Sequence, residues 1–246
     1  MLTQRIGGYK LNRNSALLNT MIAAVAVLGL GLAVLAAFAW SDEDILFLAS
    51  LAFMTIISEL VDLGPFGNSR VSISIVLICA AGVFSGLPGA VIIACVSAGV
   101  DAAAHRKASK KVVFNTGVLV ATGAVYCGVT SLLASGVDAH DWTARLGPSM
   151  AGAAAAYVVN SGFVTMAISM DKGLDPFSVW NSRFRWLLPH YIVIGLLAVM
   201  MALAYDRWDV GGLALFLVPL GMVWLAMKQY ADGIVRTPVV PSTTPA

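Results

Sequence analysis

The chain has 246 residues, of which 59% are hydrophobic and 11% are charged. An average soluble domain has about 25% charged residues, so this composition excludes an ordinary cytosolic enzyme, a disordered protein and a nucleic-acid-binding protein. The 15 basic and 13 acidic residues give a net charge of +2, which is too balanced to indicate an anionic partner. The composition predicts an all-α integral membrane protein with membrane lipids, and no nucleic acid, as partners.

The N-terminal part of the chain predicts two spans. Residues 1–16 are expected to form a cytoplasmic segment, followed by an apolar run at Leu17–Trp40. This run reaches the length of about 20 residues that crosses a bilayer and exceeds the core of a signal peptide, so we expect it to remain as the first helix. After an acidic run at 41–44, a second span is predicted at Ile45–Leu63.

The next apolar stretch, from residue 71 to residue 104, is too long for one ordinary span. Gly86-Leu87-Pro88-Gly89 lies in its middle, and glycine and proline interrupt helices. We therefore predict a broken hairpin made of two short helices, Val71–Ser85 and Pro88–Ala104.

Four further spans complete the predicted bundle of about eight transmembrane helices. They are Val112–Ser135, Pro148–Met170, Pro189–Tyr205 and Val210–Tyr230. The transmembrane domain is thus predicted at residues 17–230. Residues 231–246 contain three prolines and several serines and threonines, which predicts a disordered cytoplasmic tail.

The basic residues test this map, because cytoplasmic loops of membrane proteins carry an excess of lysine and arginine. With eight spans, thirteen of the 15 basic residues fall on the side of both termini, and Arg145 and Arg207 fall opposite. We therefore expect a multi-pass protein of the bacterial inner membrane with both termini in the cytoplasm.

Acidic residues inside the predicted spans are the first candidates for a functional site, since a charge in the membrane is costly. Glu59 and Asp62 share one helical face, and Asp101 precedes His105 by four residues. All four map to the cytoplasmic ends of their helices, where Arg70, Arg106 or Lys107 could compensate them. Three interpretations stay open: a salt-bridged collar, a proton or cation site, and direct binding of a ligand.

Two asparagines, Asn115 and Asn160, lie within the fifth and sixth predicted spans. Lipid offers an amide side chain no hydrogen-bond partner, so each asparagine is expected to bond inside the bundle. Their role is interhelical bonding or the lining of a ligand cavity.

The loop at Asp171–Leu188 alternates aromatic and basic residues. These include Trp180, Arg183, Arg185 and Trp186. The pattern is typical of an amphipathic helix at the membrane interface, and recognition of a partner is the alternative.

Motifs of catalysis and metal binding are missing from the sequence. It contains no Walker A, HExxH or GxSxG motif, and no nucleophile, base and orienting group occur together, so we expect a protein that is not an enzyme. Cys79, Cys95 and Cys127 form no metal-binding pattern. We expect neither a metal nor a cofactor.

Several segments resemble the multi-span membrane domain that precedes the catalytic domain of bacterial HD-domain (HD-GYP-like) phosphohydrolases and of some diguanylate cyclases. The likeness covers roughly Ile45 to Tyr230 and rests on Gly64–Ser74, Val71–Lys111, Val113-Phe114-Asn115, Tyr157-Val158-Val159-Asn160, Trp180, Leu187–Tyr191 and Leu217–Leu220. The resemblance implies a domain that senses a signal and passes it to a cytoplasmic output domain. Only 16 residues follow Tyr230, too few for such a domain, so we expect a stand-alone relative or a separate output polypeptide.

The sequence thus predicts a non-enzymatic membrane sensor or ligand-binding module that signals to a cytoplasmic partner. A small-solute transporter or its substrate-binding subunit is the alternative. The short split helices are similar to the substrate-binding components of energy-coupling-factor vitamin transporters, although those usually have six spans. A structural subunit of a larger membrane complex, packed through small residues such as Ala151–Ala156, is a third interpretation.

Overall fold

The computed structural model describes residues 3–40, 45–60, 74–138 and 141–236, with side chains described between 15 and 218. Within these ranges the chain is entirely helical and has no strand, as predicted for an all-α protein. The elements are α1 Thr3–Phe38, α2 Ile45–Leu60, α3 Ser74–His105, α4 Ser109–Leu133, α5 Trp142–Lys172, α6 Pro176–Arg183, the 3₁₀ turn η1 Arg185–Leu187 and α7 Leu188–Arg236.

Five stretches of helix are long and apolar enough to cross a membrane among the described residues. They are Ser15–Phe38, Ser74–His105, Ser109–Leu133, Trp142–Lys172 and Arg185–Val218, and α2 is a shorter apolar helix. Their outward faces carry large apolar side chains: Phe38 is 86% exposed and Val27 71%. Exposed apolar surface of this extent is unfavourable in water and is typical of a lipid-facing bundle, so the structure indicates a membrane protein.

Helix α3 is interrupted at Gly86, where φ is 66° and ψ is −151°. A positive φ of this size favours glycine, which has no Cβ to collide with the backbone. A Cβ built on Gly89 would lie 2.9 Å from the carbonyl oxygen of Ala81, although residues eight apart in one straight helix are separated by about 12 Å along its axis. The helix therefore bends sharply at Gly86, which separates a first part of α3, before it, from a second part, after it.

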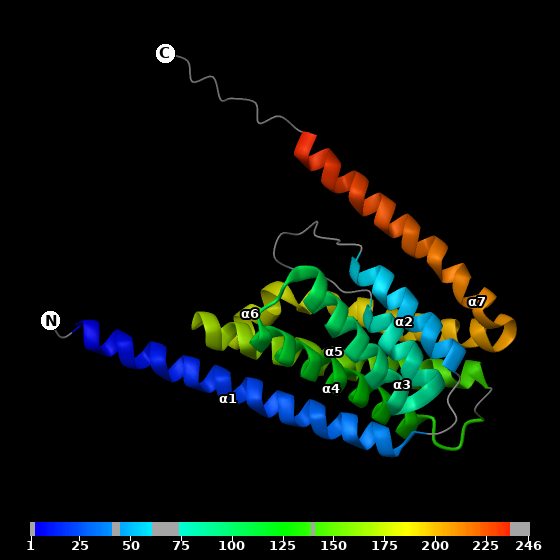
Figure 1. Cartoon of the computed structure of the whole chain (residues 1–246), viewed down its shortest axis with the longest axis horizontal. Helices are drawn as coiled ribbons and strands as arrows, with labels where there is room; N and C mark the ends of the chain where they lie inside the picture. Colours follow the sequence, from blue (N-terminus) through cyan, green and yellow to red (C-terminus); the bar gives the residue numbers. More distant parts are fainter. Residues whose placement is uncertain (1–2, 41–44, 61–73, 139–140, 237–246) are drawn as a thin grey trace, which may run out of the picture.

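Helix α7 contains a second interruption, at Trp208 and Asp209. The φ of Asp209 is 48°, and a Cβ built on Gly212, eight residues after Ala204, would collide with the Ala204 carbonyl group. The helix bends sharply here as well. In Figure 1 the last part of α7 returns from this turn and diverges from the rest of the bundle towards the C-terminus.

Glycines let several helices pack backbone against backbone. A Cβ on Gly117 of α4 would lie 2.6 Å from the Val25 carbonyl oxygen of α1, and one on Gly195 of α7 would lie 2.6 Å from the Ser149 carbonyl oxygen of α5. Such close contacts bring van der Waals attraction between helices that lipid would not otherwise drive together. Figure 1 shows α1 lying along one side of the bundle, in line with this contact to α4.

Helix α5 begins at Trp142, six residues before the predicted start at Pro148. The side chain of Asp141 accepts a hydrogen bond from the backbone N–H of Ala144 and caps the helix. An aspartate cap is a strong start signal, and it outweighs the proline inside the helix, which sequence reasoning read as the first residue.

Two other helix ends also differ from the predicted boundaries. Helix α1 starts at Thr3, within the predicted N-terminal segment. Helix α7 continues to Arg236, so residues 231–236 are helical where a disordered tail is predicted. Between Tyr230 and Arg236 the sequence has one glycine and no proline, so nothing there forces the helix to end. The rest of the predicted tail, 237–246, lies outside the described residues.

Candidate functional site

A polar cluster of three residues lies at one end of the bundle and joins α2 to both parts of α3. The hydroxyl oxygen of Ser97 lies 2.7 Å from Oε1 of Glu59 and 2.9 Å from the hydroxyl oxygen of Ser74. Ser97 and Ser74 are buried and Glu59 is partly buried. We call Glu59, Ser74 and Ser97 the polar cluster. It places a carboxyl group between helices that are otherwise apolar at this level.

The single proton of Ser97 gives the polar cluster two arrangements. A serine hydroxyl has one proton and can accept two hydrogen bonds, so Ser97 donates either to Glu59 or to Ser74. An ionised Glu59 accepts only and draws the Ser97 proton towards itself. A protonated Glu59 has a proton to donate to Ser97, which then frees the Ser97 proton for Ser74. The Ser97 proton thus has two alternative acceptors, one on α2 and one on the first part of α3.

A second acidic residue, Asp101, lies on α3, on the same helical face as Ser97. Asp101, four residues after Ser97, accepts from His105 Nδ1 at 3.0 Å and forms an ion pair with Lys107. Arg106, between these partners, has a φ of 46°, and the N–H of Lys107 donates to the Ala102 carbonyl oxygen at 3.3 Å. This bond to a carbonyl five residues back is typical of a helix that ends at a residue in the left-handed conformation, here Arg106. Asp101 bonds to the residues on either side of Arg106, His105 and Lys107.

The structure therefore brings some of the predicted acids together and not others. Glu59 and Asp101 do not bond to each other, but Ser97 and Asp101 lie on one face of α3 because residues four apart share a face. The Lys107 ion pair to Asp101 is the contact expected of a salt-bridged collar. Asp62 lies outside the described residues.

Asn160 bonds across two helices. Its Nδ2 donates to the hydroxyl oxygen of Tyr191 at 2.5 Å, joining α5 to α7. The Tyr191 ring meets that of Tyr157 edge to face, with centroids 5.3 Å apart. This contact is an interhelical bond, one of the two roles predicted for Asn160. Asn115 is partly buried on α4, and within the described part of the chain no hydrogen bond joins it to Asn160 or to the polar cluster.

Two linked hydrogen bonds of buried hydroxyl groups inside the bundle were not predicted from the sequence. The oxygens of Tyr126 and Ser149 lie 2.5 Å apart, and Ser149 donates to the Gly195 carbonyl oxygen at 2.7 Å. These bonds link α4, α5 and α7. Tyrosines and serines in apolar helices carry no spacing signal, so only the packing identifies them. Ser74 and Ser97 were missed for the same reason.

The predicted interfacial loop holds helix α6 and the turn η1. Asp175 caps α6 by accepting from the Ser178 N–H at 2.7 Å, and Trp180 packs against the core. Arg183, Arg185 and Trp186 are exposed. The four predicted residues of this loop therefore divide into one that holds the segment to the bundle and three that face outwards.

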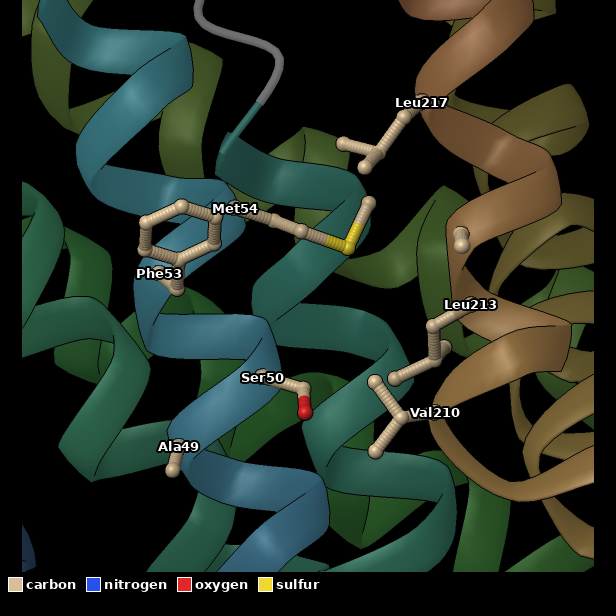
Figure 2. Close-up of a pocket in the computed structure, with 8 residues that line it drawn as sticks. Ala49, Ser50, Phe53, Met54, Val210, Leu213 and Leu217 are labelled. Atoms are coloured by element: carbon tan, nitrogen blue, oxygen red, sulfur yellow. The ribbon is translucent and has the colours of Figure 1, made fainter.

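An apolar groove of about 320 Å³ lies between α2 and the second part of α7 (Figure 2). Met54, Leu213 and Leu217 project into it from the two sides. The complete lining is Ala49, Ser50, Phe53, Met54, Val210, Leu213, Ala214 and Leu217. The Ser50 hydroxyl is bonded within its own helix, to the Leu46 carbonyl oxygen at 2.7 Å, so the groove has no free polar group to orient a polar ligand.

At the opposite end of the bundle, the first residues of α5 form hydrogen bonds with α3 and α7. Nε1 of Trp142 donates to Oδ2 of Asp206 at 3.1 Å, and Nη1 of Arg145 donates to the Val83 carbonyl oxygen at 3.5 Å. Hydrogen bonds from the Thr143 hydroxyl and the Ala144 N–H lower the pKa of the Asp141 carboxyl. These contacts fix the ends of helices and bring no catalytic constellation together.

Metal ligands do not gather in the described part of the chain, where no three His, Cys, Asp or Glu side chains come together. Cys79 and Cys127 are buried, Cys95 is exposed, and none of them forms a disulfide.

Comparisons with known proteins find no match: no family model, no curated protein and no solved structure is similar to this chain at a significant level.

Proposed function

We propose that the chain is a non-enzymatic membrane sensor or ligand-binding module, in which the polar cluster of Glu59, Ser74 and Ser97 receives the signal. The signal changes the charge or the hydrogen bonding of Glu59 and shifts the population between two packings of α2 against α3. The output is read by a cytoplasmic partner at the connection between α3 and α4. The same role is what the sequence patterns that resemble the membrane domains of HD-domain phosphohydrolases would imply.

The proposal includes eight spans with both termini in the cytoplasm. The reversals at Gly86 and at Trp208–Asp209 support it, because each divides one long helix into two antiparallel parts. The charges support it as well. With these reversals the basic connection that holds Arg106 and Lys107 lies on the same side as the N-terminus, and the positive-inside rule assigns that side to the cytoplasm.

One observation carries the functional proposal: the Ser97 hydroxyl bridges Glu59 of α2 and Ser74 of the first part of α3. A carboxyl group in a membrane bundle is costly and marks a functional site by default. The Ser97 proton has two alternative acceptors, which is the two-state element that a population shift requires. Asp101 follows on the same helical face and is tied to His105 and Lys107, so a movement of this part of α3 reaches the basic connection.

The experiment measures the position of that connection in the full chain, reconstituted in lipid nanodiscs. Spin labels on A108C and S178C, both at exposed positions, report the distance between the α3–α4 connection and α6, with Cys95 replaced by alanine to prevent labelling there. We expect Glu59→Gln, which mimics the protonated acid, to shift the distance distribution. Ser97→Ala, which removes the bridge, is expected to broaden it.

Ser50→Ala is the matched control, since it also removes one hydroxyl from an apolar helix but breaks only a bond within α2. Its distance distribution is expected to match that of the parent chain. If Glu59→Gln and Ser97→Ala both give the same distribution as Ser50→Ala, the polar cluster does not control the connection and the sensor proposal fails.

Transport is the second candidate function, favoured by the same carboxyl group with hydroxyl partners inside the bundle. The predicted path lies near Asn115, Asn160, Glu59 and Asp101, and no hydrogen bond among the described residues links the two asparagines to the two acids. Proton flux into liposomes that contain the full chain and a pH-sensitive dye, driven by a potassium diffusion potential, tests it. Flux abolished by Glu59→Gln favours transport over sensing.

A role as a structural subunit has less support. Gly152, Ala153 and Ala156, from the small-residue face at Ala151–Ala156, are buried within this chain. A Cβ on Gly152 would press against Thr130 and Tyr126 of α4. Three of the small residues expected to contact a partner helix are thus buried within this chain, and Gly152 packs on α4.

A further inference from the structure

The connection between α5 and α7 carries two arginines that no described acidic residue neutralises. Arg183, in the last turn of α6, and Arg185, in η1, are both exposed. Nη1 of Arg185 donates to the Asn181 side-chain oxygen at 3.2 Å, a neutral partner. Among the described residues the ion pairs within 4 Å involve Asp101 instead. Two guanidinium groups, each with several free donors, are therefore presented at this connection.

Large apolar side chains stand beside these arginines. Phe177 is 71% exposed and Trp186 is 50% exposed. The Trp186 indole N–H donates to the Arg183 carbonyl oxygen at 2.9 Å, and its ring meets His190 edge to face at 5.2 Å. The other side of the same segment faces the bundle, since Val179 is buried. The segment is amphipathic, with an outer surface that combines positive charge and aromatic rings.

The position of the segment decides which partner fits that surface. Leu188 begins α7 directly after η1, and both Leu188 and Val193 are exposed apolar residues of the lipid-facing surface. The arginines therefore lie where the apolar surface of the bundle begins. At this level a bilayer offers phosphate groups next to hydrocarbon, whereas an acidic soluble protein would offer charge without an apolar layer beneath it.

We propose that the α6–η1 segment binds the phosphate of an anionic phospholipid through Arg183 and Arg185, with Trp186 and Phe177 inserted between headgroups and acyl chains. Guanidinium groups bind phosphate oxygens with paired, charge-assisted hydrogen bonds. Aromatic rings with a polar atom favour the headgroup level. The proposal concerns a different surface from the polar cluster and is independent of the proposed sensor function.

Lipid bound at this segment stabilises the whole bundle, because the segment is tied to it. The Tyr157 hydroxyl of α5 donates to the carbonyl oxygen of Phe184 at 3.0 Å, and Phe184 stands between the two arginines in the chain. A ligand that binds only the folded state raises the midpoint of unfolding by mass action. Thermal unfolding therefore reports the binding.

The test uses the full chain in detergent, with phosphatidylglycerol or with phosphatidylcholine of the same acyl chains added at equal concentrations. We expect phosphatidylglycerol to raise Tm more than phosphatidylcholine does. The double variant R183Q/R185Q is expected to lose at least half of this difference. Arg207→Gln is the matched control, because Arg207 is an exposed arginine at the other end of the first part of α7, and it is expected to keep the full difference.

Three outcomes overturn the proposal. The first is an equal Tm of the parent chain in the two lipids. The second is that Arg207→Gln loses as much of the Tm difference as R183Q/R185Q does. The third is that soluble glycerol phosphate raises Tm as much as phosphatidylglycerol does, which would indicate a free-phosphate site. If R183Q/R185Q does not fold, the salt dependence of the parent chain decides. The difference between the lipids should shrink strongly between about 0.1 and 1 M NaCl, where the screening length falls from about 10 to 3 Å. A difference unchanged by salt contradicts binding through the arginines.

Discussion

The indole Nε1 of Trp142, the first residue of α5, donates to the Asp206 carboxylate at 3.1 Å, just before the reversal in α7. Trp142 is buried, so the bond holds two distant parts of the chain at one end of the bundle. The hydrogen bond from Trp142 thus anchors α7 to α5 just before the turn at Trp208–Asp209.

Replacing Trp142 by phenylalanine should destabilise the chain by about 2 kcal/mol, because the change removes the hydrogen bond to a charged acceptor and some buried atoms. Thermal unfolding in detergent measures the loss. Trp40→Phe removes the same atoms from an exposed side chain and should change Tm little. Equal effects of the two substitutions would show that the contact with Asp206 contributes nothing.

Gly117→Ala should destabilise the chain by about 1–3 kcal/mol, because the new methyl group would lie 2.6 Å from the Val25 carbonyl oxygen and force α1 away from α4. Gly128→Ala in the same helix meets open space and should be neutral or stabilising, since alanine favours helix over glycine. Denaturation of both variants in mixed micelles compares them. A stable Gly117→Ala variant would contradict the close contact between these helices.

Arg106→Gly should be more stable than Arg106→Ala by about 1 kcal/mol, because Arg106 has a φ of 46° and only glycine adopts this conformation without strain. Both substitutions remove the same charge, so their difference isolates the backbone. Unfolding midpoints in detergent measure it. An alanine variant as stable as the glycine variant would mean that the connection adopts another conformation.

The cap at Asp141 should make stability depend on pH in acid. Hydrogen bonds from the Thr143 hydroxyl and the Ala144 N–H lower its pKa from the ordinary 3.8, so the folded form binds its proton less readily than the unfolded form. The stabilisation is fully present above the unfolded pKa and is lost as pH falls through the folded pKa. Asp141→Asn keeps a capping side chain that does not titrate.

The difference in Tm between the parent chain and Asp141→Asn should therefore be constant from about pH 7 to pH 5. Below about pH 4 the Tm of the parent chain should fall relative to that of Asp141→Asn. A Tm difference independent of pH across this range would exclude the cap as the cause.

The helical fold follows from composition and apolar runs, and the structure confirms it for the described residues. The membrane class follows from the same runs, and five helices long and apolar enough to cross a membrane support it. The sequence also indicates the interruption near Gly86, because glycine and proline occur together there. The boundary at Pro148 was wrong, since a capping aspartate seven residues earlier starts the helix. The residues of the candidate site could be predicted only singly: Glu59 is conspicuous as an acid in an apolar helix, but its partner Ser97 is 38 residues away. That pairing depends on how α2 packs against α3, which no local pattern encodes.

Helix α1 extends far beyond its closest contact with the bundle. Its backbone touches α4 closely at Gly29, opposite Gly117, and Lys110 of α4 holds Asn19 by a hydrogen bond at 3.1 Å. From Gly29 the helix continues for about 39 Å to Thr3, at 1.5 Å per residue. A tilt of about 5° at the glycine contact would thus move its far end by about 3 Å. A small change of tilt at the glycine contact is therefore much larger at the N-terminal end of α1 than inside the bundle.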